Sequence, residues 1–457
     1  MGKNKQREKD IKAAGYKLVT ITSCEWSQKV RNDGIESYYM KNEKEQEEIS
    51  IEIKQQQLLD DIRRDKIFGF VKCDIHVPDH LIDKFSEYPP IFKNTEIDIK
   101  DIGETMQAYC ESIGRKNGVK RSLISSMHGK GIIILTPLLK WYLENGLVVD
   151  DVEFIIKYNP KTCFDWFMNQ VCDERRAADI GGSEQKIIGE MFKLMGNNAY
   201  GGILMDKSKH TTTSFAKKKN IDKHTGNPFF KGHIELNHDI FEVTKQKSKI
   251  VHDLPIQLGL AVYSYAKLRM LEFWKFIHTY LENDLYQLME TDTDSLYIAF
   301  AKDTIDECVK PHLKEQWETE KWNWFCSEDT KTHVEFRGKF ITKKEYDRRT
   351  PGKFKEEYRG IGMVCLNSKT YIIWESLDGK KWKLSSKGVQ EKRNELTPLD
   401  YIYTLHTHEP KIIENAGLIR DKQGLIHLYT QQKQGISYFY CKRKILPDGI
   451  STTHLDI

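Results

Sequence analysis

The chain has 457 residues, of which 39% are hydrophobic and 30% charged, and its formal net charge is +4. This length exceeds that of one ordinary domain, and the apolar fraction suffices for several hydrophobic cores. Nine cysteines without a Cys-x-x-Cys pair indicate neither a zinc ribbon nor a disulfide framework. The segment Met1 to Lys12 is too charged for a signal peptide, and no apolar run reaches the roughly 18 residues of a membrane span. We therefore expect a soluble intracellular protein without a membrane partner.

The first third of the chain predicts short helices and strands. Residues 1 to about 70 are rich in charge and predict amphipathic helix with one short strand, Tyr16 to Ile21. From Phe68 to about Tyr158, short strands alternate with turns that contain proline, and Leu138 to Asn145 predicts a helix.

Residues 163 to 200 predict a helical hairpin. Apolar residues recur at helical spacing from Phe164 to Val171, Gly181-Gly182 supplies the break, and Ser183 is placed to cap the next helix. One stripe of this second helix carries four polar or aromatic residues: Lys186, Lys193, Asn197 and Tyr200. The stripe combines two cations for phosphate oxygens, an amide, and a ring on which a base could lie. The alternative is a surface helix with incidental lysines.

The remaining segments predict a mixture of strands and helices. Residues 201 to 250 predict strands and basic loops, whereas Leu254 to Tyr280 predicts a long helix. Four residues of that helix form a stripe typical of a hydrophobic core: Met270, Phe273, Trp274 and Ile277. Strands are predicted at Phe336 to Thr342 and Met363 to Trp374, and a mixed helical pattern follows from about residue 395.

Two carboxylates stand two residues apart in the run Glu290 to Tyr297, which predicts one end of a β-hairpin. Residues i and i+2 of a strand share a face, so Asp292 and Asp294 are expected to face one polar pocket. Hard divalent cations such as Mg²⁺ take oxygen ligands and keep positions open for phosphates. The pair therefore indicates phosphoryl transfer, and a solvated turn is the alternative.

The helix motif Lys-x-x-x-Asn-x-x-Tyr-Gly, followed about ninety residues later by Asp-Thr-Asp-Ser, resembles motifs B and C of family B DNA polymerases. Asn198 stands where that family usually has Ser. Lys369 and Tyr371 resemble the family's Lys-x-Tyr element, which contacts the primer terminus, and Lys387-Gly388 resembles the Lys-Gly element beyond it. Flanking stretches such as Thr136 to Leu147 look like the viral and mobile-element branch, which includes protein-primed enzymes.

The resemblance implies an α+β fold with the right-hand architecture of a polymerase. Four parts follow from it: a palm remainder with a possible insertion (1–160), a helical-hairpin fingers region (161–201), a palm of antiparallel sheet with motif C (202–394) and a thumb (395–457). The family's motif A and its exonuclease motifs are not recognisable, so we expect a chain that is incomplete at its N-terminal side. The nearest substitute for motif A contains Asp74, which we interpret as an outward residue of a half-buried strand.

The resemblance also implies template-directed DNA synthesis, in which two Mg²⁺ or Mn²⁺ ions assist nucleotide transfer from a deoxynucleoside triphosphate to a primer 3′-hydroxyl. It implies metal binding by Asp294, with Asp292 as the supporting carboxylate. Nucleotide binding is implied for six residues: Arg175, Arg176, Lys186, Lys193, Asn197 and Tyr200. DNA binding is implied for three residues: Lys369, Tyr371 and Lys387.

The implied partners are primer-template DNA, deoxynucleoside triphosphates and a terminal protein primer, in the nucleus or at a viral replication site. Two basic clusters with interleaved aromatics, Lys207 to Lys249 and Arg337 to Arg393, favour nucleic-acid binding, and solvated basic loops are the alternative. Two other functions compete with synthesis. One is a catalytically dead remnant that binds DNA. The other is an RNA-templated polymerase, against which the Asp-Thr-Asp-Ser pattern argues, because reverse transcriptases carry adjacent aspartates.

Overall fold

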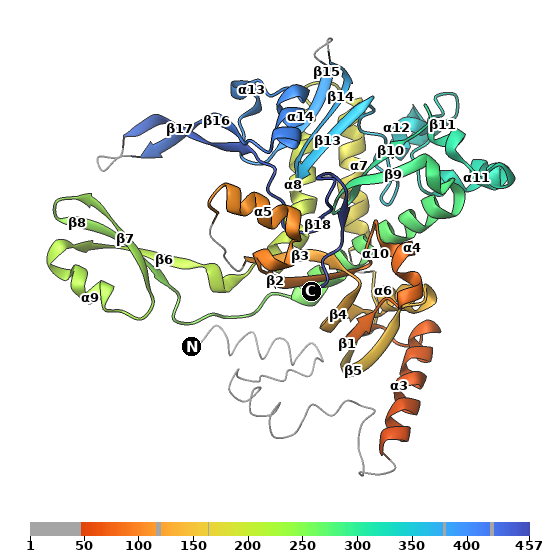
Figure 1. The fold of residues 1–457 in the computed structure, drawn as a ribbon, viewed down its shortest axis with the longest axis horizontal. Helices are drawn as coiled ribbons and strands as arrows, with labels where there is room; N and C mark the ends of the chain where they lie inside the picture. The colour runs from red at the N-terminus through yellow and green to blue at the C-terminus, as the bar shows by residue number, and fades with distance from the viewer. Residues whose placement is uncertain (1–46, 116–119, 163, 378–380, 421–424) are drawn as a thin grey trace. The chain divides into compact units, whose positions relative to one another are not determined.

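The computed structural model describes residues 47–457 except 116–119, 163, 378–380 and 421–424 (Figure 1). The predicted strand Tyr16 to Ile21 lies outside these residues. The chain divides into two compact units: the first comprises Met1–Ile75 and Lys130–Asn159, and the second comprises His76–Gly129 and Pro160–Ile457. The structure is mixed α and β, and the sheets of the second unit are antiparallel, in agreement with an α+β fold. None of the described helices is long and apolar enough to cross a membrane.

The first unit is built on a three-stranded sheet. Its elements are α3 (Glu47–Arg63), β1 (Gly69–His76), β4 (His128–Leu135), α6 (Thr136–Glu144) and β5 (Val148–Lys157), and the strand order is β4-β1-β5. Buried and half-buried residues alternate along β1, and Asp74 is one of the half-buried ones. Its carboxylate accepts a hydrogen bond from the Gly131 backbone N–H (2.6 Å). Asp74 is therefore an outward strand residue, as predicted, and it ties β1 to β4.

The second unit contains most of the chain. Its N-terminal elements are α4 (Ile82–Phe85), β2 (Ile91–Ile97), α5 (Glu104–Ser112), β3 (Lys120–Ser126), α7 (Asp165–Ile180), α8 (Lys186–Gly201), β6 (Thr211–Lys217), α9 (Ile221–Thr225), β7 (Phe230–Asn237), β8 (Ile240–Gln246) and α10 (Ile256–Tyr280). The elements that follow are β9 (Tyr286–Asp292), β10 (Ser295–Phe300), α11 (Lys314–Glu320), β11 (His333–Phe336), β12 (Lys339–Thr342), α12 (Lys343–Asp347), β13 (Gly362–Asn367), β14 (Thr370–Ser376) and β15 (Lys381–Ser386). The last are α13 (Glu391–Asn394), α14 (Pro398–Thr407), β16 (Lys411–Arg420), β17 (Ile426–Ile436), β18 (Lys444–Ile445) and β19 (Thr452–Thr453).

Helices α7 and α8 form the helical hairpin that the sequence predicts. Two glycines of α8 let the helices approach closely. A Cβ on Gly189 would lie 3.0 Å from the Ala178 Cβ, and a Cβ on Gly196 would lie 3.3 Å from Val171 Cγ1. A spacing of seven residues is about two helical turns, so both glycines lie on the same side of α8, the side that faces α7.

Helix α10 contributes buried aromatic side chains to a hydrophobic core. The predicted stripe Met270, Phe273, Trp274 and Ile277 is buried, which confirms its interpretation as core. Phe273 stacks on Phe354 with ring centroids 4.1 Å apart, and Phe276 stacks on Trp317 at 5.2 Å. The tryptophan-rich segment after β10 therefore serves packing.

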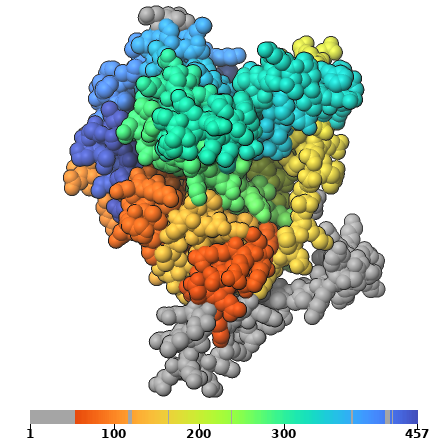
Figure 2. Space-filling view, turned by 90° about the vertical axis from the view of Figure 1, so that its right-hand side faces the viewer, coloured from red at the N-terminus to blue at the C-terminus, as the bar shows by residue number. Residues whose placement is uncertain are grey.

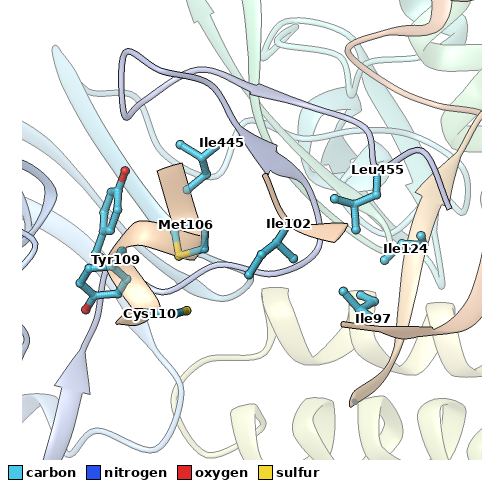
Figure 3. Packing of buried hydrophobic residues seen from close by; sticks show 9 residues of the cluster. Ile97, Ile102, Met106, Tyr109, Cys110, Ile124, Ile445 and Leu455 are labelled. Atoms are coloured by element: carbon cyan, nitrogen blue, oxygen red, sulfur yellow. The ribbon is translucent and has the colours of Figure 1, made fainter. Parts of the chain in front are cut away.

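The last sixty residues differ from the helical pattern expected of them. They contain α14, but more of their residues lie in strands than in helix, in the long β16–β17 hairpin and the short β18–β19 pair. The segment also packs against distant parts of the chain. Ile445 and Leu455 join one buried cluster with residues of β2, β3 and α5, among them Ile97 and Met106 (Figure 3). The predicted boundary at residue 395 therefore separates residues that share hydrophobic cores, although the four-part division itself stays a prediction.

Candidate functional site at the junction of two hairpins

The two aspartates lie at the tip of the β9–β10 hairpin. Asp292 ends β9 and pairs with Ser295, the first residue of β10, so Thr293 and Asp294 form the turn. The Asp294 N–H donates to the Asp292 carbonyl oxygen (2.5 Å), and Thr293 has a φ of +50°. A positive φ is strained for a β-branched residue and costs of order 1–3 kcal/mol. The structure thus holds this tip in a strained conformation.

The turn corrects one sequence expectation. Asp292 and Asp294 do not share a strand face, because Asp294 lies in the turn and only Asp292 in the strand. Asp294 is exposed, whereas Asp292 is half-buried. Both carboxylates nevertheless remain at one hairpin tip.

A second strained turn, between β13 and β14, contacts this tip. Its Lys369 has a φ of +62°. The Lys369 backbone N–H donates to Glu290 Oε1 (2.9 Å), and its Nζ donates to Asp292 Oδ2 (2.6 Å). Glu290 and Asp292 are alternate residues of β9, so the lysine bridges one face of the strand with its backbone and its side chain. We call Glu290, Asp292, Tyr297, Lys369 and Tyr371 the hairpin junction.

The tyrosines of the hairpin junction join the strands behind the two turns. The Tyr297 hydroxyl of β10 donates to the Tyr371 hydroxyl of β14 (2.7 Å), and the ring centroids are 4.6 Å apart. Tyr371 is only 7% exposed. The Ser385 hydroxyl of β15 donates to the Lys369 carbonyl oxygen (3.2 Å) and so supports the second turn from its other side. Lys387 is exposed just after β15.

The charges of the hairpin junction are unbalanced. Burial raises the pKa of the Glu290 carboxyl to about 7, although the Lys369 N–H acts in the opposite direction. The pKa of Lys369 is raised, mainly by its hydrogen bond to Asp292. One ammonium therefore faces the carboxylates of Asp292 and Asp294 and the Glu290 carboxyl, which is partly protonated at neutral pH. Such a surface attracts cations.

The fit to a two-metal site is incomplete. Within the described part of the chain, no group of three His, Cys, Asp or Glu side chains is placed to hold a metal ion. Asp292 is moreover engaged by Lys369. A site for two ions requires carboxylates that converge from more than one strand. The two tip aspartates do not provide this set by themselves.

The predicted nucleotide-binding stripe lies on α8, which buries none of its side chains. Lys186, Lys193 and Asn197 are exposed. The Lys193 Nζ lies 3.4 Å from Glu190 Oε2, and Tyr200 packs edge-to-face against Tyr263 of α10. The three polar residues are thus open to a ligand. No hydrogen bond or ion pair recorded between described residues connects this stripe to the hairpin junction.

The two arginines of α7 have different surroundings. Arg176 is 4% exposed, pairs with Asp173 (2.5 Å), donates to the Tyr346 carbonyl oxygen (3.2 Å) and stacks on the Tyr346 ring. Protein groups therefore occupy its guanidinium, which leaves little of it for a triphosphate. Arg175 makes no recorded hydrogen bond to a described residue, and burial beside Arg349 lowers its pKa. Of the predicted pair, Arg175 is the arginine available to an anion.

Helix α7 is fixed to the segment after β11 by ion pairs. Arg349 holds both Asp179 oxygens (2.6 and 2.7 Å), and Arg337 pairs with Glu174 (2.6 Å). In Figure 2 the yellow residues of the helical hairpin lie beside the teal residues that include α12. These contacts hold one helix of the hairpin while the other, α8, keeps its exposed face.

Sequence reasoning missed Glu290 and Tyr297. Their partners are 79 and 74 residues away, so no local pattern reports these contacts. One signal was present, because Glu290 shares its strand face with Asp292.

Comparison of the chain with protein-family models, curated proteins and solved structures found no match.

Proposed function

We propose that this chain takes part in template-directed DNA synthesis, by nucleotide transfer to a primer 3′-hydroxyl, as a component of a polymerase resembling family B. The observation that carries the proposal is the hairpin junction. The Lys369–Asp292 hydrogen bond joins the Lys-x-Tyr element to the Asp-Thr-Asp-Ser run, 77 residues away, and Tyr371 bonds Tyr297, two residues after that run. The resemblance assigns the first run to catalysis and the second to the primer terminus, and these two roles require adjacent sites.

The geometry of Lys369 suits a DNA strand beside the carboxylates. Its side chain is 53% exposed while it holds Asp292. An ammonium has three donors, so two remain for phosphate oxygens. Tyr371 follows Lys369 by two residues, in β14, where its hydroxyl and ring contact Tyr297. A primer terminus bound by Lys369 would therefore lie against the aspartates of the tip.

The reaction class uses divalent cations to activate the 3′-hydroxyl and to stabilise the triphosphate. Because the tip aspartates do not complete such a site, the proposal requires at least one further carboxylate. Asp294 is the exposed candidate ligand of the tip, and Asp292 supports it. On α8, Lys186 and Lys193 provide charge for the triphosphate, together with Arg175 of α7. Asn197 and Tyr200 would lie on the side of the nascent base pair.

A second candidate function is a DNA-binding remnant without synthesis. The incomplete carboxylate set favours it. Both candidates bind DNA, but only a polymerase has a reason to recognise the recessed 3′ end of a primer. Recognition of that end therefore tests the proposal.

The test compares a duplex with a recessed 3′ end with a blunt duplex, by fluorescence anisotropy with the full chain. We expect tighter binding of the recessed end, and a loss of about ten-fold or more in Lys369→Ala, because a charge-assisted contact is worth roughly 1.5–3 kcal/mol. Lys314→Ala, at an exposed lysine of α11, is the matched control. Equal affinity for both duplexes, or equal effects of the two substitutions, would contradict the proposal.

A further inference from the structure

The segment between α8 and α10 forms a small sheet of its own, in the strand order β6-β8-β7 (Figure 1). One face carries a small core of Ala216, Phe241 and Val243, against which Ile221 and Phe230 pack. Strand residues alternate between faces, so the residues between these core positions point to the other side. That other side is not covered by the small core, and we call it the open face.

The open face presents exposed apolar side chains in a row. Phe215 of β6 pairs with Glu242 of β8, which pairs in turn with Ile234 of β7. Paired residues of adjacent strands point to the same side. Phe215 is 68% exposed and Ile234 63%. The next pair on this face is Lys217 with Ile240, which places a cation beside the row.

The sheet also lies in a strongly basic part of the chain. Between Lys207 and Lys249 there are ten lysines against four acidic residues, a net charge of +6, whereas the whole chain carries +4. Lys207 and Lys209 are paired with Asp253 and Asp206. Five exposed lysines make no recorded ion pair with a described residue: Lys217, Lys218, Lys219, Lys223 and Lys231. The exposed ring of Phe215 and these unpaired lysines together suit a polyanion that has flat apolar groups exposed beside its negative charges.

We propose that the open face binds single-stranded DNA, with a base stacked on Phe215 and the phosphates held by the lysines around Lys217. Single strands expose the faces of their bases, and sequence-tolerant proteins bind them through aromatic rings and basic surfaces. A duplex hides those faces, so Phe215 would contribute nothing to duplex binding. This site goes beyond the proposed function, because it is separate from the hairpin junction and needs no synthesis.

Removal of the Glu242 charge should strengthen binding to the open face, whereas the other substitutions should weaken it. Its carboxylate stands between Phe215 and Ile234 on the open face. A strand bound across this row would place phosphate charge near the carboxylate, and like charges repel. We therefore expect Glu242→Gln to tighten single-strand binding, whereas the same substitution leaves a site elsewhere unaffected.

The experiment uses the full chain, a fluorescein-labelled thymidine oligonucleotide of about twenty residues, and EDTA to exclude metal-dependent steps. Phe215→Ala should weaken binding at least about five-fold, the lower end of the range for one base stacked on an aromatic ring. Tyr403→Ala is the matched control, because Tyr403 is 53% exposed on α14 and lies outside both basic clusters. Replacing Lys217, Lys218 and Lys219 by Ala should reduce the log-log salt slope by about 2, at roughly 0.7 for each phosphate contact.

Three results would overturn the proposal. One is an equal effect of Phe215→Ala and Tyr403→Ala. Another is a salt slope that the triple lysine variant leaves unchanged. The third is an equal loss of blunt-duplex and single-strand affinity in Phe215→Ala, which would assign the sheet to a duplex backbone. Because Phe215 is exposed, unchanged thermal midpoints are expected and exclude misfolding. The assay needs neither a primer nor a nucleotide, so its failure is distinguishable from failure of the proposed function.

Discussion

The hydroxyl pair of Tyr297 and Tyr371 gives a quantitative test of the hairpin junction. In Tyr297→Phe the Tyr371 oxygen, on a side chain only 7% exposed, loses its donor. A buried polar group left without its partner costs about 1–3 kcal/mol. In Tyr371→Phe the remaining Tyr297 hydroxyl is only half-buried and can reach water, so the expected cost is about 0.5–1.5 kcal/mol. The double substitution removes both groups and should cost less than the sum of the single ones.

The assay is native-state hydrogen exchange, read on peptides that cover β9–β10 and β13–β14, which reports the opening free energy of each hairpin. We expect a coupling energy of about 0.5–1.5 kcal/mol between the two substitutions. Opening of both hairpins should be facilitated together, because the hydroxyl pair links them. Additive effects, within the roughly 0.3–0.5 kcal/mol typical of independent sites, would refute the contact as a link between the two hairpins.

Three further predictions follow from the charges and the buried groups. Lys369→Ala and Lys387→Ala should each reduce the log-log salt slope of primer-template binding by about 1, and an unchanged slope in both would leave these lysines as solvated surface. Primer extension in Mg²⁺ by the chain alone should be no faster than by its Asp294→Asn variant, because the described carboxylates do not complete a two-metal site. Extension that depends on Asp294 would show that another carboxylate completes the site. Burial lowers the pKa of His278, which hydrogen-bonds Tyr286 (2.7 Å), so the folded state favours the neutral ring. Stability should therefore fall as the pH drops below about 6.5, and the thermal midpoint of His278→Gln should fall less; equal pH dependence would contradict this.

Long periodic segments were the part of the fold that the sequence predicted well. The helical hairpin and α10 were expected because apolar residues recur over several turns and because Gly181-Gly182 marks a break. The hairpin around Asp292 was also expected, but its register was not. A turn of two residues between β9 and β10 moves Asp294 out of the strand. The positive φ of Thr293 could not be predicted, because threonine rarely adopts this conformation.

Contacts between distant segments account for the remaining differences. Glu290 was not selected as a site residue because its role depends on the backbone of Lys369. The C-terminal region, expected to be mixed helical, contains more strand than helix, because residues such as Ile413 and Ile436 pack into a core with β13 and β14. A short apolar run can fit both the spacing of a helix and the alternation of a strand, and tertiary packing then determines which of the two forms.

Nucleotide selection on a primer that cannot be extended distinguishes template-directed synthesis from DNA binding alone. A labelled primer with a dideoxy end, annealed to a template, is bound to the full chain in Mg²⁺, and its dissociation rate is measured with each of the four deoxynucleoside triphosphates. In template-directed synthesis only the nucleotide complementary to the template should slow dissociation, by about ten-fold or more. Lys193→Ala should remove this effect while primer-template affinity stays within about two-fold. Equal effects of all four nucleotides, or none from any of them on a chain that still binds DNA, would contradict template-directed synthesis.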